Sequence, residues 1–202
     1  MKTRLFLNLT LFSFYLFSCS SPKSYDVLIR NARIIDGSGN ASYLGDIGIQ
    51  SDTIAAIGDL SKAIGKEEID ANGMVVSPGF INMLSWAVES LIEDGKSEGD
   101  IRQGVTLEVF GEGESYGPLT ETSKQALIAA QGDIKYEITW ESLAEYLDFL
   151  EKKGVSTNVA SFLGATTLRI NTIGFEDRQA TAEEMDEMRA MVEKGMKEGA
   201  LG

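Results

Sequence analysis

The stretch Met74-Val75-Val76-Ser77-Pro78-Gly79-Phe80-Ile81-Asn82-Met83 divides the 202-residue sequence into two regions with different patterns. Before it, short apolar runs alternate with turn residues such as Asp36-Gly37-Ser38-Gly39-Asn40, which is typical of short β-strands. After it, strand-like runs alternate with helical patterns, which favours βαβ units and a parallel sheet. The stretch therefore predicts a β-rich lobe over residues 25–77 and an α/β domain over residues 78–202.

The β-rich region contains a hairpin signal. Residues 46–49 and 53–57 are apolar runs on either side of Ser51-Asp52, a spacing typical of two antiparallel strands. Upstream, a strand pattern covers residues 27–35 and is interrupted near Asn31. Strands this short need other structure to cover them, so we expect a small β-sandwich lobe.

The α/β region shows several capped elements. Residues 105–110 form a β-prone run, 121–130 are helix-like, and 155–163 again resemble a strand. We expect a helix to open at 139–141, with Thr139 as its cap and Gly154 at its end. A capping box at 181–184 starts a further helix. We expect its apolar stripe to contact the core; the stripe consists of Met185, Met188, Met191, Val192 and Met196.

The first residues read as an export signal. Lys2 and Arg4 precede an apolar run over residues 5–17, which is shorter than the roughly 20 residues of a membrane-spanning helix. The run ends at Cys19, and residues 1–19 resemble a bacterial lipoprotein signal with Cys19 as the lipidated residue. Residues 20–24 would be a linker. We expect an exported lipoprotein of the bacterial cell envelope, periplasmic or anchored to the outer membrane through Cys19; an ordinary signal peptide or an anchor helix is the alternative.

Composition excludes several chemistries. The chain has 18 Lys and Arg against 31 Asp and Glu, a net charge of −13, one Cys and no His. Without His there is no Ser-His-Asp or Cys-His catalysis and no His metal ligand within this chain. One Cys forms neither an intrachain disulfide nor a thiolate zinc cluster. The acidic balance also argues against nucleic-acid binding, which needs clustered Lys and Arg.

Several motifs resemble those of one enzyme family. Residues 74–83 resemble the entry to the barrel of the amidohydrolase superfamily, and residues 26–37 resemble that family's first β-sandwich strands. Residues 103–106 (Gln-Gly-Val-Thr) and 198–202 (Glu-Gly-Ala-Leu-Gly) resemble the N-acyl-D-amino-acid deacylase, or D-aminoacylase, branch. The resemblance implies an α/β fold: a partial (β/α) barrel of the TIM type, preceded by the N-terminal strands of a β-sandwich lobe.

The resemblance also implies an activity. Family members hydrolyse an amide with the help of a metal, usually zinc, which polarises the carbonyl and activates a water molecule. A carboxylate accepts the proton of that water and passes it to the leaving amine. In this branch the substrate is a small molecule, an N-acyl-D-amino acid, and the products are a free D-amino acid and an acyl acid.

The sequence departs from the family at the first barrel strand. The family pattern there is Asp-x-His-x-His, whereas this chain has Asn82, Leu84 and Trp86 at those three positions. Leu and Trp side chains offer no lone pair to a metal, and Asn is a neutral replacement for the acid. We therefore expect this half of the usual metal site to be missing, and this chain alone not to bind zinc.

The loop after the second barrel strand, residues 110–118, is the second candidate site segment. It follows a predicted strand at the end where barrels place their active-site loops. D-aminoacylases place a metal-binding Cys in this loop, and the matching position here is Gly113. Because carboxylates can bind zinc, Glu112 is the preferred substitute ligand or general base, with Glu114 second. The alternative is a solvated acidic loop. Glu108, within the strand, faces either the barrel interior or the outside.

A third segment, residues 158–169, ends in Arg169. By the resemblance, this is a later barrel strand whose Arg169 could bind a substrate carboxylate with two hydrogen bonds. The alternative is that Arg169 pairs with Glu176 or Asp177 nearby.

The length is short for the implied fold. A (β/α)₈ barrel takes about 250 residues, whereas residues 78–202 number 125. The first interpretation is therefore an N-terminal portion of a secreted deacylase-like amidohydrolase that is inactive as this chain alone. The second is a non-catalytic envelope lipoprotein that acts as a binding module. In the third, a separate chain completes the barrel.

Overall fold

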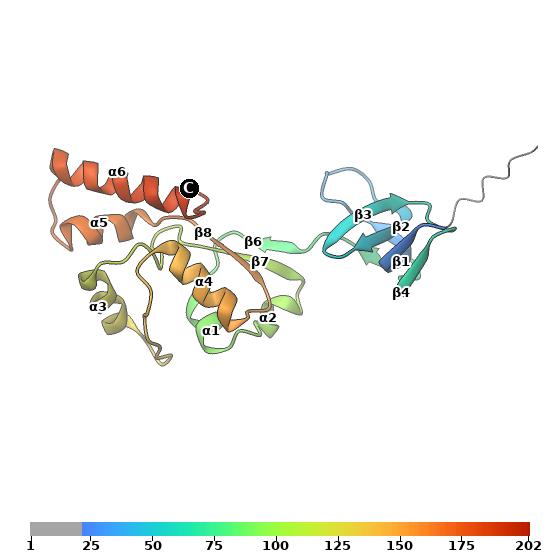
Figure 1. Cartoon of the computed structure of the whole chain (residues 1–202), viewed down its shortest axis with the longest axis horizontal. Coiled ribbons are helices and arrows are strands. Elements are labelled where there is room, and N and C mark those ends of the chain that lie inside the picture. The colour runs from blue at the N-terminus through green and yellow to red at the C-terminus, as the bar shows by residue number, and fades with distance from the viewer. Residues whose placement is uncertain (1–21) are drawn as a thin grey trace, which may run out of the picture. The chain divides into compact units, whose positions relative to one another are not determined.

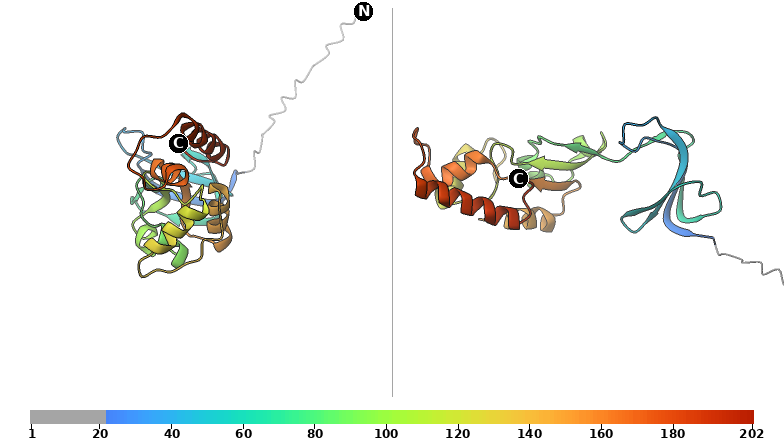
Figure 2. Two further views of the ribbon diagram at one scale, coloured as in Figure 1. Left: turned by 90° about the vertical axis from the view of Figure 1, so that its left-hand side faces the viewer. Right: turned by 90° about the horizontal axis from the view of Figure 1, so that it is seen from above.

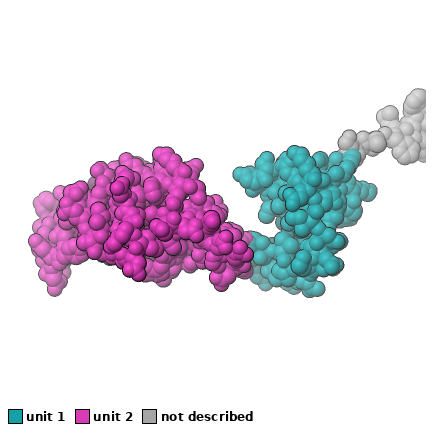
Figure 3. All heavy atoms as spheres, turned by 90° about the horizontal axis from the view of Figure 1, so that it is seen from below, with its two compact units in different colours: residues 1–78 teal, residues 79–202 magenta. Residues whose placement is uncertain are grey.

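The computed structural model describes residues 22–202 (Figure 1). The chain divides into two compact units, Met1–Pro78 and Gly79–Gly202, which Figure 2 shows from two further sides and Figure 3 shows as filled atoms. The predicted lipoprotein signal with Cys19 lies outside the described residues. Within residues 22–202, no helix has both the length and the apolar character that crossing a membrane requires.

The first unit contains a five-stranded sheet with β1 at its centre. Strand β1 pairs antiparallel with β2 and parallel with both β4 and β5, and β2 pairs antiparallel with β3. The strands are β1 (Ser24–Ile34), β2 (Tyr43–Gln50), β3 (Thr53–Gly58), β4 (Ile64–Asp70) and β5 (Val75–Val76). The β2–β3 pairing confirms the predicted hairpin.

The predicted interruption near Asn31 is a bulge within one continuous strand. Asn31 has φ 54°, and the register of β1 against β2 shifts between Ile29 and Ala32. Leu28 and Ala32, on either side of the bulge, are both fully buried but belong to separate apolar clusters: Leu28 packs with Tyr25 and Ala63, and Ala32 packs with Ile34 and Ile47.

The second unit alternates strands and helices. Its three strands are parallel, in the order β6-β7-β8: β6 (Phe80–Asn82), β7 (Val105–Phe110) and β8 (Asn158–Ser161). The helices are α1 (Val88–Glu93), α2 (Glu98–Ile101), α3 (Glu121–Ala130), α4 (Leu143–Lys153), α5 (Ala165–Ile173) and α6 (Ala182–Lys197). This confirms a mixed α/β fold, the strand at 105–110 and the helix at 121–130.

The core of the second unit lies against α4. Leu143, Tyr146 and Leu150 lie on one face of this helix and are fully buried. They pack with Phe110 at the end of β7 and with Trp140, whose ring centroid is 5.2 Å from that of Tyr146. Burial of these large side chains fixes the position of the strand ends.

Helix α4 begins later than predicted. Its N-cap is Ser142, because Glu145 completes a capping box with Ser142, whereas Thr139 precedes the helix. Trp140 instead donates a hydrogen bond from Nε1 to the carbonyl of Tyr116 at 2.7 Å. Gly154 ends the helix at φ 78°, as predicted.

The apolar stripe of α6 is not a core contact, so that prediction is wrong. Met185 and Met196 remain 39% and 46% exposed, and Met188 is only half-buried. The reason is packing: α6 lies mainly beside α5 (Figure 2), which leaves Met185, Val192 and Met196 of the stripe exposed. The predicted capping box of α6 is confirmed, with Thr181 as N-cap and Glu184 at its third position.

Candidate functional site

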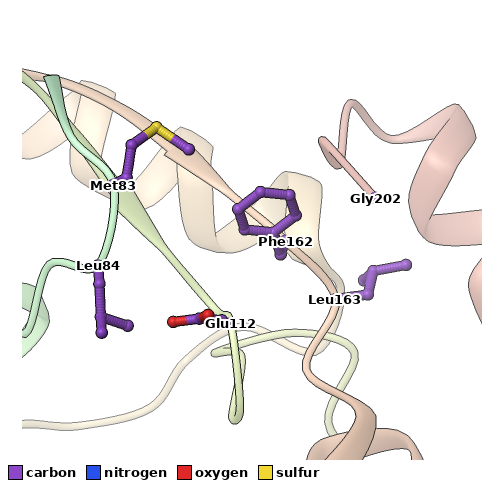
Figure 4. Close-up of a pocket in the computed structure, with 6 residues that line it drawn as sticks. All are labelled: Met83, Leu84, Glu112, Phe162, Leu163 and Gly202. Atoms are coloured by element: carbon purple, nitrogen blue, oxygen red, sulfur yellow. The ribbon is translucent and has the colours of Figure 1, made fainter.

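Two neighbouring cavities lie at the carboxyl ends of β6 and β7. Parallel strands bring these ends to one edge of a sheet, so the loops at 83–86 and 111–116 meet there. The first, here called the apolar cavity, has about 390 Å³ (Figure 4). Its lining residues are Met83, Leu84, Glu112, Phe162, Leu163 and Gly202.

The second, here called the acidic cavity, has about 510 Å³ and shares Leu84 and Glu112 with the first. Three carboxylates line it, those of Glu89, Glu112 and Glu114, and no Lys or Arg does. These residues come from helix α1 and from the loop after β7, so two separate segments converge on one space. The cavity therefore carries an excess of negative charge.

The loop with Glu112 and Glu114 is held by buried hydrogen bonds. Thr167 Oγ1 accepts from Ser115 N at 2.8 Å and donates to Ser115 O at 3.1 Å. Ser115 Oγ in turn accepts from Gly164 N at 3.1 Å. A Cβ at Gly164 would come within 2.5 Å of the carbonyl oxygen of Gly113, so only glycine permits this close approach. The two carboxylates thus sit on a fixed backbone.

Two aromatic side chains also line the acidic cavity. Trp86 is 87% exposed there, and Tyr116 is half-buried. The hydroxyl of Tyr136 lies 3.1 Å from that of Tyr116 and 3.3 Å from Oε1 of Glu89. Burial, followed by the hydrogen bond with Tyr136, raises the pKa of Tyr116 well above its usual range, so its phenol stays protonated and neutral.

The structure brings two of the predicted site residues, Glu112 and Glu114, together in one cavity. Leu84 and Trp86, at the positions where the family has His, both line the acidic cavity with Glu112 and Glu114. Asn82 lies in β6, paired with Glu108 of β7. The two loops that follow these paired strands therefore lie at the same edge of the sheet.

The residues present do not fit a zinc ion by themselves. Within residues 22–202, no group of three or more His, Cys, Asp or Glu side chains is arranged to hold a metal. Leu84 and Trp86 contribute no donor atom, and the carboxylates of Glu89, Glu112 and Glu114 are not arranged around one point as metal ligands are. The roles of Glu112 and Glu114 as ligand or general base stay predictions.

Arg169 lies apart from this site. It lines a different cavity of about 790 Å³, beside Asp177 and Arg178. Its Nη2 donates to the main-chain carbonyls of Glu176 at 2.8 Å and of Arg178 at 2.7 Å, so the contact with Glu176 is to the backbone and not to the carboxylate. Arg169 thus holds the segment after α5, and its predicted role as a substrate ligand stays a prediction.

Glu108 faces the helices. It is fully buried, and neither carboxylate oxygen has a hydrogen-bond partner within the described residues. It pairs with Val159 of β8, which packs against the core around α4, and aligned residues of paired strands point to the same face. Glu108 is therefore separate from both cavities.

Three residues that line the acidic cavity were not predicted from the sequence to do so: Glu89, Trp86 and Tyr116. Glu89 lies on a helix of only six residues, too short for a recognisable pattern. Tyr116 was part of the candidate loop, but its hydrogen bond to Tyr136 joins positions 20 residues apart. Trp86 was noted only as a missing ligand, although an exposed Trp is itself a signal for binding.

Comparison with known proteins agrees with these features. No protein-family model matches the sequence. The D-aminoacylase of Alcaligenes xylosoxydans xylosoxydans is 35% identical over 189 residues, which are 92% of this chain and 38% of that protein. A D-aminoacylase structure from a study of its binuclear metal centre has a TM-score of 0.77 and 32% identity, and the match covers 88% of this chain and 38% of the other.

A second solved relative carries a different specificity. It is N-acyl-D-glutamate deacylase from Bordetella bronchiseptica, in complex with zinc and a phosphonate that mimics the tetrahedral intermediate of the reaction. Its TM-score is 0.74 at 27% identity, over 89% of this chain and 38% of that one. The chain thus spans about 38% of the length of these relatives. In sequence and in fold, over the part that it spans, this chain is a homologue of D-aminoacylase, whose structure defines a subset of the amidohydrolases.

Proposed function

We propose that this chain forms the N-terminal part of a deacylase site for N-acyl-D-amino acids and does not hydrolyse them alone. In this proposal β1–β5 are strands of a β-sandwich lobe, and β6–β8 are the first strands of a (β/α) barrel. The whole protein would be an exported, metal-dependent amidohydrolase of the bacterial cell envelope, anchored through a lipid on Cys19.

The observation that carries the proposal is the position of the acidic cavity. It lies at the carboxyl ends of parallel strands, where a barrel of this kind binds its substrate. Its volume of about 510 Å³ falls in the range of small-molecule sites. The similarity to deacylases extends over the same strands and loops.

The chemistry of the cavity explains why we propose that this chain does not hydrolyse the substrate alone. Amide hydrolysis in relatives of known structure involves a metal centre, and the first strand of this chain ends in Leu84 and Trp86. This chain's own residues can bind and orient a substrate. Trp86, Leu84 and Tyr116 form apolar and aromatic walls of the cavity, and buried hydrogen bonds hold the loop of Glu112 in place. Hydrolysis would need further groups.

The test is to separate binding from turnover. The full chain would be titrated with N-acetyl-D-methionine and N-acetyl-L-methionine while the fluorescence of Trp86 is followed; the other tryptophan, Trp140, is buried and serves as an internal reference. We expect saturable binding that favours the D-enantiomer, and no release of free methionine with or without added zinc.

Variants sharpen the result. Trp86→Ala should abolish the binding signal, whereas Ile54→Ala, an exposed apolar change in the first unit, should leave it unchanged. Absence of binding to either enantiomer would refute the proposed site. Turnover by the chain alone would show that its residues suffice for catalysis. Equal binding of both enantiomers, unchanged in Trp86→Ala, would instead favour a binding module of another specificity.

A further inference from the structure

We propose that the acidic cavity selects N-acyl-D-amino acids whose side chain is cationic, such as those of D-arginine and D-lysine. This inference rests on the proposed function, because it names the substrate class of the same site. It follows from the charge of the cavity and from the two aromatic rings that line it.

The charge of the cavity is uncompensated. Glu112 and Glu114 form no ion pair with any Lys or Arg in the part of the chain that the structure describes. Glu89 likewise forms no ion pair in the described residues and accepts a hydrogen bond from the hydroxyl of Tyr136. The three acidic side chains together repel an anion and attract a cation.

This charge conflicts with most N-acyl-amino acids. Such a molecule carries an α-carboxylate, so its net charge is −1 with a neutral side chain and −2 with an acidic one. A guanidinium or ammonium side chain brings the net charge to zero and places a positive group among the carboxylates. The cavity therefore discriminates by charge, against acidic substrates first and neutral ones second.

The aromatic walls favour the same ligand. The exposed indole of Trp86 lines the cavity, as does the neutral phenol of Tyr116, which lies on the same loop as Glu112 and Glu114. Aromatic faces attract a guanidinium or ammonium group, and Trp does so best. The aliphatic part of an arginine or lysine side chain can in turn contact Leu84 and Leu127, which also line the cavity.

The test compares two ligands of nearly equal shape. N-acetyl-D-arginine and N-acetyl-D-citrulline differ in a guanidinium against a neutral urea, and N-acetyl-D-glutamate serves as the anionic probe. With the full chain and calorimetric or Trp86 fluorescence titration, we expect the arginine derivative to bind at least about tenfold more tightly than citrulline, equivalent to about 1.4 kcal/mol. The glutamate derivative should bind most weakly.

Charge variants show whether the carboxylates cause the preference. Glu112→Gln and Glu114→Gln should each lower the arginine-to-citrulline affinity ratio, because the arginine derivative loses an attractive charge and the citrulline derivative, which has a net charge of −1, loses a repulsive one. Glu112→Lys should move the preference towards glutamate. Glu183→Gln, on the exposed side of α6, is the matched control and should change nothing. Thermal unfolding confirms that each variant is folded.

The outcomes separate the two proposals. Equal affinity for arginine and citrulline derivatives, or a ratio unchanged in the Glu112→Gln/Glu114→Gln double variant, overturns the charge selection while the binding function stands. Failure of every N-acyl-D-amino acid to bind, N-acetyl-D-methionine included, overturns the proposed function itself.

Discussion

The hydroxyl of Thr167 binds the main chain of Ser115 on both sides, accepting from its N–H at 2.8 Å and donating to its carbonyl at 3.1 Å. Both residues are buried, and they join α5 to the loop of the acidic cavity. One side chain therefore sets where Glu114, the preceding residue, lies.

This contact gives the first prediction. Thr167→Val keeps the shape of the side chain but leaves a buried N–H and a buried carbonyl without a partner. We expect the free energy of unfolding of the second unit to fall by about 1–3 kcal/mol. Urea unfolding measures it. Thr167→Ser retains the hydroxyl and should stay close to the wild-type value; a similar loss in both variants would assign the effect to packing.

The start of α6 predicts a pH dependence of stability. Arg178 donates two hydrogen bonds, of 2.7 Å and 2.6 Å, to the carboxylate of Glu184, and these lower the pKa of Glu184 to about 2. A depressed pKa in the folded state stabilises the helix above the unfolded pKa of about 4.5, and the stabilisation is lost as the pH falls towards 2. Glu184→Gln should therefore be less stable than wild type at pH 7.

The measurement for this prediction is local. Amide hydrogen exchange in the first turn of α6 should be faster in Glu184→Gln at pH 7, and the difference in stability from wild type should narrow between about pH 5 and 2. Glu187→Gln, also on α6 but outside the contact with Arg178, is the control. A difference that persists at pH 2 would argue against the ion pair as its source.

The third prediction contrasts two apolar residues of the second unit. Leu150 on α4 is fully buried, whereas Met196 on α6 is 46% exposed. Leu150→Ala should lower the free energy of unfolding by about 2–5 kcal/mol, because it leaves a cavity in the core. Met196→Ala should change it by less than about 0.5 kcal/mol. Thermal unfolding followed by circular dichroism distinguishes them, and equal losses would mean that the stripe of α6 is covered in solution.

The elements that the sequence predicts best are those with local signals. Thr181 and Gly154 mark helix ends through their own side chain or backbone, and both lie where predicted. Strand β4 escaped prediction because its Lys66, Glu67 and Glu68 are exposed and charged, so it has no alternating apolar pattern. Pairing with β1 holds it, through contacts such as the 2.8 Å ion pair between Arg30 and Glu68.

The site follows the same division. The convergence of residues 84–86 with Glu112 and Glu114 is predictable, because parallel strands end at one edge of a sheet. The position of Glu89 on the cavity wall depends on how α1 packs. The exposure of the α6 stripe depends on which element lies beside it. Neither of these can be predicted from the local sequence. The position of Arg169 depends on the loop after α5, which folds back onto its guanidinium.

The pairing of β1 with three later strands has a consequence for biosynthesis. Strand β1 leaves the ribosome before all of its partners, and its parallel partner β4 follows some 40 residues later, from Ser24 to Ile64. Each newly made strand thus meets a template that already exists, and no early segment has to wait for a distant one to begin assembly. Because β1 is apolar, its edges would otherwise stay unpaired during translation, and this order shortens the time in which β1 could associate with neighbouring chains.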